Sequence, residues 1–595
     1  MSDQMTTGKL IRRALAESPV LAEGLRLTLV MAMVGQAITI VTPVVFQQII
    51  DEEILNPAGI DIGDVIVRAA VAFAALIVGI VVGRAALLRL VRTSSAGLSD
   101  LRTMTFNHLL RQSVLHVQAE RRGNLVSRVT SDVTTLQEFM EWGGVSLVVA
   151  SSQVLLATAV MFYYEWRLAL ISLVGVTLYL YLMRWFQKIL RRNYDSVRVE
   201  VGKSLGVLSE SISAIPVVRA YGVETETKER VADALESRFQ REYKTNWFGN
   251  SLFSSAEVFA GAMTTAIVVG GVVIGVSQGM TAGELIAFFF LTNLLIEPLQ
   301  IVVETLEFSQ SAASGLRRVL EVLDSEVEIE DPDNPVDLPD SGLAVRFDGV
   351  GFSYPTGGNV LTDVRVEIKE GSRVAVVGET GSGKTTFAKL LVRLLDPTEG
   401  VIEVGGVRLD RVPLAQLRSR VAFVPQEGFL FDDTIANNVR YGRLDATDAE
   451  IFTAFHELDL GDWLDALPGG LETMVGERGA GMSAGERQLV ALVRAWIGSP
   501  DLLVLDEATS AVDPSLDVAL RHAMDRLIKG RTSVTIAHRL ATAEAADDIL
   551  VFERGYVVEQ GPHRHLIERG GVYADLYADW SAGTKTVCRL LGSKP

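Results

Sequence analysis

Eight residues, Gly378 to Thr385, have the spacing Gly-x-x-x-x-Gly-Lys-Thr. Four strand-forming residues precede them and a helix-like stretch follows, which is the context in which such a loop holds phosphate groups on its backbone N–H groups. Lys384 is placed to reach the β- and γ-phosphates, and the Thr385 hydroxyl to ligate Mg²⁺. We therefore predict an ATP site formed by Gly378, Glu379, Thr380, Gly381, Ser382, Gly383, Lys384, Thr385 and Thr386.

Two adjacent carboxylates, Asp506 and Glu507, end the apolar run 502–505. Such a run is typical of a buried parallel strand, which would deliver both acids to the sheet edge where the phosphate loop lies. We expect Asp506 to ligate Mg²⁺ and Glu507 to polarise an attacking water as general base. The alternative is that the two acids cap a helix beginning at residue 508, which suits either acid alone better than the pair.

A further strand pattern, 533–537, ends in His538. A histidine is usually structural or on the surface, but at the end of a strand in this sheet it is a candidate for contacting the γ-phosphate. Short strands alternate with helical patterns over residues 342–580, which predicts an α/β domain around a mainly parallel sheet. The acidic, proline-rich stretch 324–341 is interpreted as a linker between this domain and the first half of the chain.

The composition combines a membrane part with an acidic soluble part. The chain has 595 residues, of which 48% are hydrophobic, yet its formal net charge is −18. This acidic balance argues against nucleic acid as a partner, since phosphate backbones need clustered Lys and Arg. The single cysteine, Cys588, cannot form an internal disulfide, and residues 1–17 do not resemble a cleaved signal peptide. The tail 581–595 has the character of a fusion scar and is left out of the fold prediction.

Six apolar segments over residues 1–323 predict a transmembrane domain. Lys and Arg gather on one side of them, whereas the opposite loops hold almost none beyond Arg68 and Arg167. The asymmetry places both termini and both long polar stretches in the cytoplasm. The alternative, a hydrophobic soluble helical domain, would not need this charge asymmetry. The segments are approximately 25–50, 65–88, 143–162, 168–182, 252–275 and 285–303.

Two long polar stretches, roughly 93–140 and 185–247, have helical periodicity without the Gly and Pro punctuation of loops. We expect helices that continue from the spans well into the cytoplasm. Each pair of helices must turn within its stretch, and the candidate turns are 116–123 and 214–216.

Taken together, these motifs resemble an ABC ATPase fused to the transmembrane half of an ABC exporter, over roughly residues 10–580. Segments 116–139 and 211–222 are similar to that family's two coupling regions. The motifs that carry the resemblance are Tyr354, Gly378–Thr385, Gln426, 475–479, 482–488, Asp506-Glu507, 510–513 with Asp513, and His538.

The resemblance implies further roles. Tyr354 would stack on adenine, Gln426 would sense Mg²⁺ and the attacking water, and Ser483 and Gly485 would hold the γ-phosphate of the nucleotide on a second subunit. Asp513 would also belong to the nucleotide site. One chain carries one phosphate loop and one signature, so the resemblance implies a dimer with a second half-transporter subunit.

One departure from the family pattern concerns the signature, usually Leu-Ser-Gly-Gly-Gln, which here reads Met-Ser-Ala-Gly-Glu at 482–486. Ala484 adds a methyl group where glycine would let the backbone approach a phosphate. Either the methyl is tolerated in a homodimer, or this chain pairs with a different chain and its signature faces a weaker site. Steric reasoning favours the heterodimer.

Two acids within the predicted spans, Glu257 and Glu297, are candidates for binding a cationic amphipath, since charges in a bilayer are costly. Asn293, Gln300 and 288–290 would line the same cavity. The alternative is that both acids face helix partners or water near the inner leaflet. We expect export of an amphipathic or lipid-like small molecule, with membrane lipids as neighbours. Import of a siderophore-like solute, lipid flipping and an ATP-gated channel remain open. Abundant Arg, Ala and Gly with few Lys suggest the inner membrane of a bacterium.

Overall fold

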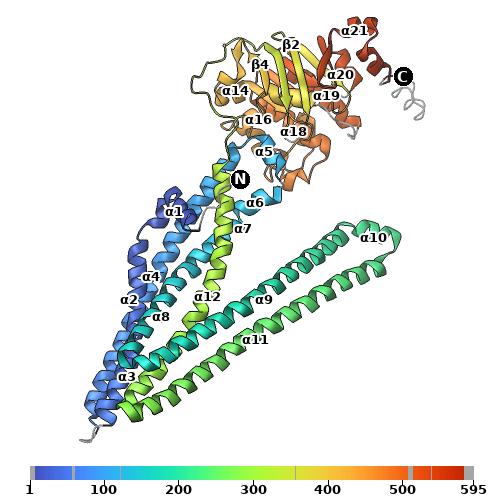
Figure 1. Ribbon diagram of the computed structural model, residues 1–595. Coiled ribbons are helices and arrows are strands. Elements are labelled where there is room, and N and C mark those ends of the chain that lie inside the picture. The colour runs from blue at the N-terminus through green and yellow to red at the C-terminus, as the bar shows by residue number, and fades with distance from the viewer. Residues whose placement is uncertain are drawn as a thin grey trace. The chain divides into compact units, whose positions relative to one another are not determined.

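A computed structural model of the chain describes residues 7–55, 60–120, 122–355, 357–506, 514–537, 539–579 and 581 (Figure 1). The chain divides into two compact units. The first consists of residues 1–110 and 121–325 and is helical, and the second consists of residues 111–120 and 326–595 and is α/β. The predicted order, a six-span helical domain followed by an α/β domain, is confirmed.

Six helical stretches of the first unit are long and apolar enough to cross a membrane, as the sequence predicts. They are Leu25–Ile54, Ile62–Arg111, Asn124–Tyr164, Trp166–Ser213, Glu257–Ile274 and Ala282–Val302. The helices of this unit are α1 (Thr7–Glu17), the short 3-10 helix η1 (Pro19–Ala22), α2 (Leu25–Thr39), α3 (Val41–Gln48), the π-helical turn η2 (Ile49–Ile54), α4 (Ile62–Arg111), α6 (Arg122–Val129), α7 (Ser131–Glu138), the π-helical turn η3 (Phe139–Gly143), α8 (Gly144–Tyr164), α9 (Trp166–Ser213), α10 (Ile215–Tyr221), α11 (Glu224–Gln278) and α12 (Ala282–Asp324).

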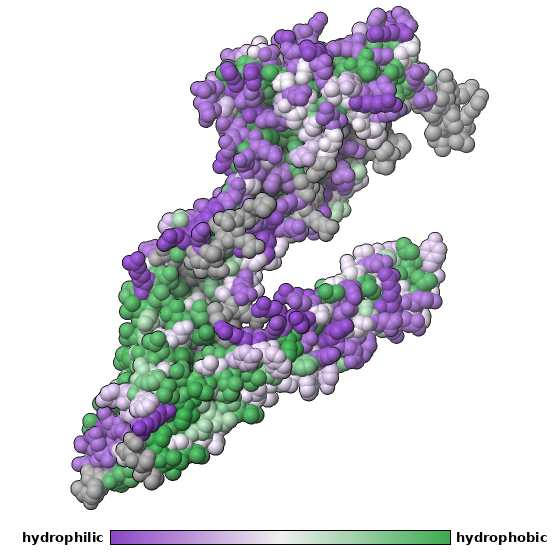
Figure 2. Space-filling model, viewed as in Figure 1, coloured by the Kyte–Doolittle hydropathy of each residue, from purple (hydrophilic) through white to green (hydrophobic). Residues whose placement is uncertain are grey.

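The long helices run from apolar to polar sequence without a break, as the periodicity of the polar stretches predicts. Helix α4 has 50 residues and α11 has 55, far more than the roughly 20 that cross a bilayer. Helices α9 and α11 lie side by side, with apolar side chains over one half of the pair and polar side chains toward α10 (Figures 1 and 2).

Both polar stretches turn within the ranges that the sequence predicts. The predicted turn at 214–216 is confirmed: Ala214 ends α9, Pro216 occupies the first turn of α10, and Gly222 ends α10 with φ +66°. In the first stretch the long helix α4 ends at Arg111, earlier than the predicted turn 116–123, and a second break at Glu120, between α5 (Val114–Ala119) and α6, lies within that range. Helix α5 belongs to the second unit, where Leu115 packs against the main core.

The second unit contains the mainly parallel sheet that the strand pattern predicts. Its strand order is β10-β9-β3-β8-β7-β6, and only β10 is antiparallel. A separate four-stranded antiparallel sheet, of order β2-β1-β4-β5, has no counterpart in the prediction. The strands are β1 (Val345–Ser353), β2 (Asn359–Ile368), β3 (Arg373–Gly378), β4 (Glu399–Val404), β5 (Val407–Arg408), β6 (Val421–Val424), β7 (Leu502–Asp506), β8 (Thr532–Ile536), β9 (Asp548–Glu553) and β10 (Tyr556–Gly561).

Two hydrophobic cores hold this unit together. One lies between the two sheets and helix α13, where Phe387 contacts Phe347 and Phe552. The other packs helices, α18 among them, against β7. The helices are α13 (Lys384–Leu391), α14 (Leu414–Arg420), α15 (Ile435–Arg440), α16 (Asp448–Glu457), α17 (Gly461–Asp465), α18 (Ala484–Ile497), α19 (Pro514–Ile528), α20 (Leu540–Glu544) and α21 (His563–Arg569).

Candidate nucleotide-binding site

The phosphate loop joins the end of β3 to the start of α13, as its motif requires. Glycine is needed at both ends of it. Gly378 has φ +150°, and a Cβ there would lie 2.2 Å from the Phe552 carbonyl oxygen. Gly383 has φ +105°, and a Cβ there would lie 2.6 Å from Leu361 Cδ2. The loop can therefore follow this path only with bare backbone at these two positions.

Lys384 turns back onto its own loop. Its ammonium donates hydrogen bonds to the carbonyl oxygens of Gly378 at 2.8 Å and Glu379 at 2.7 Å, and the side chain is 7% exposed. Burial lowers the pKa of Lys384, and the charge of Asp506 partly opposes this shift. The ammonium group is thus held at the loop, where it can exchange a carbonyl for a phosphate oxygen.

The hydroxyl groups of Ser382, Thr385 and Thr386 differ in their burial and in their hydrogen bonding. Thr385 is exposed, whereas Thr386 is buried and its hydroxyl lies 3.2 Å from that of Tyr354. Ser382 Oγ is buried and has no hydrogen-bond partner among the described residues. A buried hydroxyl left without a partner is costly, and a phosphate oxygen would satisfy it. The loop, with an unsatisfied hydroxyl beside a lysine and bare glycine backbone, fits the phosphates of ATP.

Asp506 ends β7 and pairs in register with Ile536 of β8. Because β8 lies between β7 and β3, the carboxylate reaches the same sheet edge as the phosphate loop, and its charge acts on Lys384. Gln426 follows β6 at this edge and is exposed. With Thr385, these oxygen groups are the ligand types that Mg²⁺ prefers. Glu507, Asp513 and His538 lie outside the described residues.

The signature residues occupy a different place, the start of α18. The Ser483 hydroxyl accepts a hydrogen bond from Glu486 N at 3.3 Å, and Glu486 Oε2 accepts one from Ser483 N at 2.7 Å. This reciprocal pair is a capping box, which uses the glutamate that replaces the usual glutamine. Ala484 is exposed at the first helical position and Gly485 is buried.

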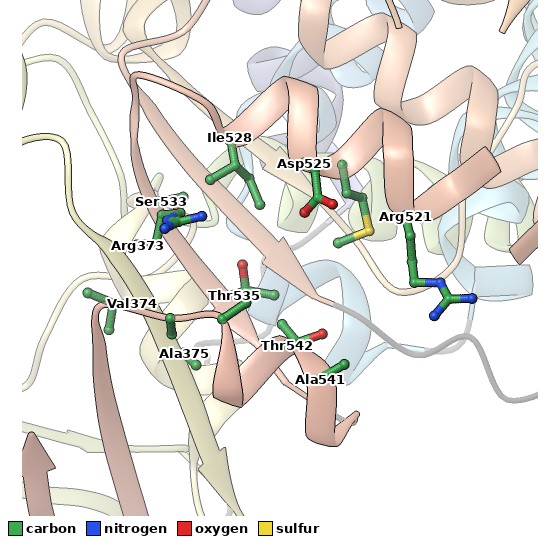
Figure 3. Close-up of a pocket in the computed structure, with 13 residues that line it drawn as sticks. Arg373, Val374, Ala375, Arg521, Asp525, Ile528, Ser533, Thr535, Ala541 and Thr542 are labelled. Carbon is green, nitrogen blue, oxygen red and sulfur yellow. The ribbon is translucent and has the colours of Figure 1, made fainter. Parts of the chain in front are cut away.

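A cavity of about 250 Å³ in the second unit is not part of this site (Figure 3). The first residues of β3, among them Arg373 and Ala375, line it together with residues of β8, α19 and α20. The phosphate loop follows the other end of β3. The two sites therefore adjoin opposite ends of that strand.

In the first unit, the two predicted span acids are exposed on the single chain. Glu257 precedes the end of α11 by 21 residues, and Glu297 follows the start of α12 by 15. At about 1.5 Å per residue, the two differ by about 9 Å along the antiparallel helices. The acid at the level of Glu257 is Glu304, which is 22 residues into α12. The sequence prediction omitted it because its span ended at residue 303.

An aromatic pair lies near Glu304. Tyr179 of α9 stacks on Phe259 of α11 at 4.4 Å between ring centroids, and its hydroxyl accepts a hydrogen bond from Gln300 of α12 at 3.2 Å. Gln300 lies one turn from Glu304. Among the other predicted lining residues, Asn293 is exposed while Phe288 is buried, and Phe290 contacts Phe46 at 5.3 Å.

Six membrane-length helices joined to a phosphate-loop ATPase domain define an ATP-driven membrane transporter. Comparison with known proteins is specific about the class. Residues 25–299 match the ABC transporter transmembrane region and residues 361–510 match the ABC transporter ATPase model. The chain belongs to the ABC transporter family.

The relatives share both halves of the chain. The chain is 32% identical over 481 residues to an ATP-dependent lipid A-core flippase of Syntrophus aciditrophicus, covering 80% of each protein. It is 34% identical over 475 residues to a fatty acid ABC transporter ATP-binding/permease protein of Mycobacterium bovis, covering 80% of this chain and 75% of that one. A bacterial Atm1-family ABC exporter with ATP bound has a TM-score of 0.79 at 26% identity, covering 94% of this chain and 98% of that one. The chain is thus an ABC half-transporter of the exporter type, which couples ATP hydrolysis to transport across a membrane.

Proposed function

We propose that this half-transporter works as a dimer, in which each ATP lies between the phosphate loop of one subunit and the signature of the other. The observation that carries the proposal is the separation of the two halves of the site within one chain. The loop lies between β3 and α13, whereas Ser483 and Gly485 begin α18 in the second core. In a dimer, the signature of one subunit would complete the site at the phosphate loop of the other.

Within one composite site, the residues of this chain have distinct tasks. Backbone N–H groups of 378–385 and the Lys384 ammonium hold the phosphates, and Tyr354 supplies a flat face for the adenine. Thr385, Gln426 and Asp506 are the residues that would hold Mg²⁺, which when bound neutralises phosphate charge. Glu507 accepts the proton of the attacking water. His538 is the candidate for contacting the γ-phosphate, and Asp513 is a further residue of the nucleotide site.

The partner subunit is proposed to be a different chain, although a homodimer is the close alternative. Ala484 supports the heterodimer because its methyl group is exposed at the first position of α18, where the nucleotide of the other subunit would dock. A methyl group there pushes a phosphate away from backbone N–H groups. The competent site would then combine this chain's Glu507 with the partner's signature.

The substrate is proposed to be an amphipathic molecule with a cationic group, exported across the inner membrane of a bacterium with both termini cytoplasmic. The acids Glu257, Glu297 and Glu304 support a cation, and the partly exposed ring of Phe259, held by stacking on the buried Tyr179, supports an apolar portion. The flippase and fatty acid relatives act on lipid-like molecules, as their names say, and these support an amphipathic substrate.

The deciding experiment is purification of this chain alone, followed by its oligomeric mass and its ATPase rate. A dimer whose hydrolysis Glu507→Gln abolishes establishes the homodimer and a role for Glu507. A monomer, or a dimer with negligible turnover that Ala484→Gly does not restore, establishes the need for a partner chain. Normal steady-state hydrolysis by Glu507→Gln contradicts its role as general base.

Direction is tested in sealed vesicles of known sidedness. ATP-dependent uptake of a cationic amphipath into inside-out vesicles supports export. ATP-dependent accumulation in right-side-out vesicles indicates an importer, lipid movement between leaflets indicates a flippase, and ion current without accumulation indicates a channel.

A further inference from the structure

The cavity in Figure 3 lies over the parallel sheet of the second unit, where residues of β3 and β8 meet residues of α19 and α20. The strands of a parallel sheet are buried on both faces and are usually apolar on both. One face of β8 follows this rule, with Val534 and Ile536 in the main core. Its other face carries Ser533 and Thr535, which are 1% and 4% exposed, while the two β7 residues paired with them are both leucines. β8 therefore presents hydroxyl groups where packing alone would favour apolar side chains.

These two hydroxyl groups line the floor of the cavity. Thr535 is paired in register with Ala375 of β3, whose side chain is too short to cover it. Figure 3 shows the Thr535 hydroxyl directed toward Ile528 and Asp525 of α19. Neither hydroxyl has a hydrogen-bond partner among the described residues. Because a buried hydroxyl without a partner is costly, a polar group bound in the cavity would be stabilised by both.

Two opposite charges stand on successive turns of α19 at the exposed rim. Arg521 and Asp525 are four residues apart, a spacing at which such side chains commonly pair. Arg521 instead turns back to Asp517, with 3.1 Å between Nη2 and Oδ2, and Asp517 is shared with Arg539. Asp525 is exposed and forms no ion pair within the described part of the chain. The rim therefore offers a carboxylate, and a guanidinium with N–H groups left for a further acceptor.

The rest of the lining is neutral and mostly apolar. Arg373, the third charged residue of the lining, is paired with Asp547, at 3.5 Å between Nη2 and Oδ1. Met524 and Ile528 contribute apolar surface from α19, and three alanines contribute it from α20 and the residues after it. The volume of about 250 Å³ equals about eight liquid-water volumes of about 30 Å³, so it suits a molecule of about eight non-hydrogen atoms.

We propose that this cavity binds a free amino acid of about the size of leucine. Its ammonium group lies against Asp525 and the Thr535 hydroxyl, and its carboxylate lies against Arg521. Its apolar side chain packs on Met524 and Ile528. A zwitterion matches both charges of the rim, whereas a cation would be repelled by Arg521 and an anion by Asp525.

The position of the cavity relates it to the nucleotide site without making it part of that site. β8 leads directly to His538, and α19 begins directly after Asp513. A bound amino acid would contact both of these elements and link them. The cavity lies wholly in the second unit, so binding there needs neither the partner subunit nor the substrate of the spans.

The experiment measures binding of radiolabelled L-leucine to the purified full chain by equilibrium dialysis without nucleotide. Asp525→Asn removes the partner of the ammonium group, and Asp465→Asn, at an exposed acid of α17, is its matched control. Thr535→Val removes the cavity hydroxyl at nearly constant volume. Thr532→Val, on the same strand but outside the lining, is its control, because the Thr532 hydroxyl accepts a hydrogen bond from Gly371 N at 2.9 Å.

Two analogues of leucine separate the charges of the ligand. Isoamylamine lacks the carboxylate, and isocaproate lacks the ammonium group. Each should bind at least tenfold more weakly than leucine, because each loses a hydrogen bond between charged groups. Isoamylamine that binds as tightly as leucine indicates a site for cations, and isocaproate that does so indicates a site for anions. Either result overturns the proposal.

We expect saturable binding of one leucine per wild-type chain. Asp525→Asn should weaken it at least tenfold, while Asp465→Asn leaves it unchanged. Thr535→Val should weaken binding without lowering the Tm of the free protein, whereas Thr532→Val should lower the Tm and keep the binding. Absence of saturable binding, or undiminished binding by Asp525→Asn, overturns the proposal. Should Thr535→Val fail to fold, the surface variant Asp525→Asn decides by itself.

Discussion

The glycine that begins α13 offers a sharp test of how the phosphate loop is held. Gly383 has φ +105°, and a Cβ on it would lie 2.6 Å from Leu361 Cδ2 and 3.0 Å from the Val360 carbonyl oxygen. Gly406 also has a positive φ, +76°, but a Cβ on it would meet nothing within 4 Å. Replacement by alanine therefore adds backbone strain at both positions and crowding at only one of them.

The two variants should differ in stability by an amount that follows from this geometry. A left-handed conformation costs an L-residue about 1–2 kcal/mol, which is the whole effect expected for Gly406→Ala. Gly383→Ala adds a crowding cost of about 1–3 kcal/mol, because the Val360 carbonyl belongs to the backbone of β2 and cannot swing away. Its free energy of unfolding should fall by about 2–5 kcal/mol in total.

ATP binding should separate the variants further. The positions of Lys384 and of the loop N–H groups depend on the backbone at Gly383. A shift of that backbone by a few tenths of an ångström should therefore weaken ATP binding at least tenfold, or about 1.4 kcal/mol. Thermal unfolding and titration with a fluorescent ATP analogue measure the two effects on the purified chain. Wild-type ATP affinity in Gly383→Ala, or equal destabilisation by Gly383→Ala and Gly406→Ala, would refute the reasoning.

Three further predictions concern single side chains. Ser382→Ala should leave the free energy of unfolding without nucleotide unchanged or higher, because it removes a buried unsatisfied hydroxyl, yet weaken ATP binding about tenfold or more; unchanged affinity in the titration contradicts it. Glu304→Gln should abolish stimulation of ATPase activity by a cationic amphipath while basal hydrolysis persists, and undiminished stimulation argues against a substrate role. Burial, with a smaller contribution from Glu544, raises the pKa of Tyr573 from 10.0 to about 12. The unfolded state therefore ionises first, and about 2–3 kcal/mol of stability should be lost between pH 10 and 12, a loss that Tyr573→Phe should remove in alkaline unfolding curves.

The sequence predicted those elements whose structure is determined by residues adjacent to one another in the chain. The phosphate loop stands between a strand and a helix because its glycines, its apolar strand and its helix former lie next to one another in sequence. Asp506 ends a buried strand for the same reason. The six spans follow from apolar length, and the helical periodicity of 185–247 with its turn at 214–216 predicted that the helix of the fourth span continues beyond its apolar run, as α9 does to Ser213.

Contacts between distant segments could not be predicted in the same way. Glu304 became a candidate only when α11 and α12 were laid antiparallel, which put it level with Glu257. The bond between the hydroxyls of Tyr354 and Thr386 depends on how β1 packs against α13, and no spacing in the sequence encodes it. The antiparallel sheet of β1, β2, β4 and β5 was missed because its strands carry no motif and pair across long separations.

Because the long helices are unbroken, the thickness of the bilayer affects how they tilt and where their far ends lie. Helix α4, with 50 residues, is about 75 Å long, whereas the hydrocarbon core is about 30 Å thick. None of α4, α9 and α11 contains a proline that could act as a hinge where lipid gives way to water. A helix cannot shorten to suit a thinner bilayer, so it tilts. Each such rod then pivots in the lipid and swings its free end sideways, so the membrane that surrounds the spans sets the angle at which their far ends stand.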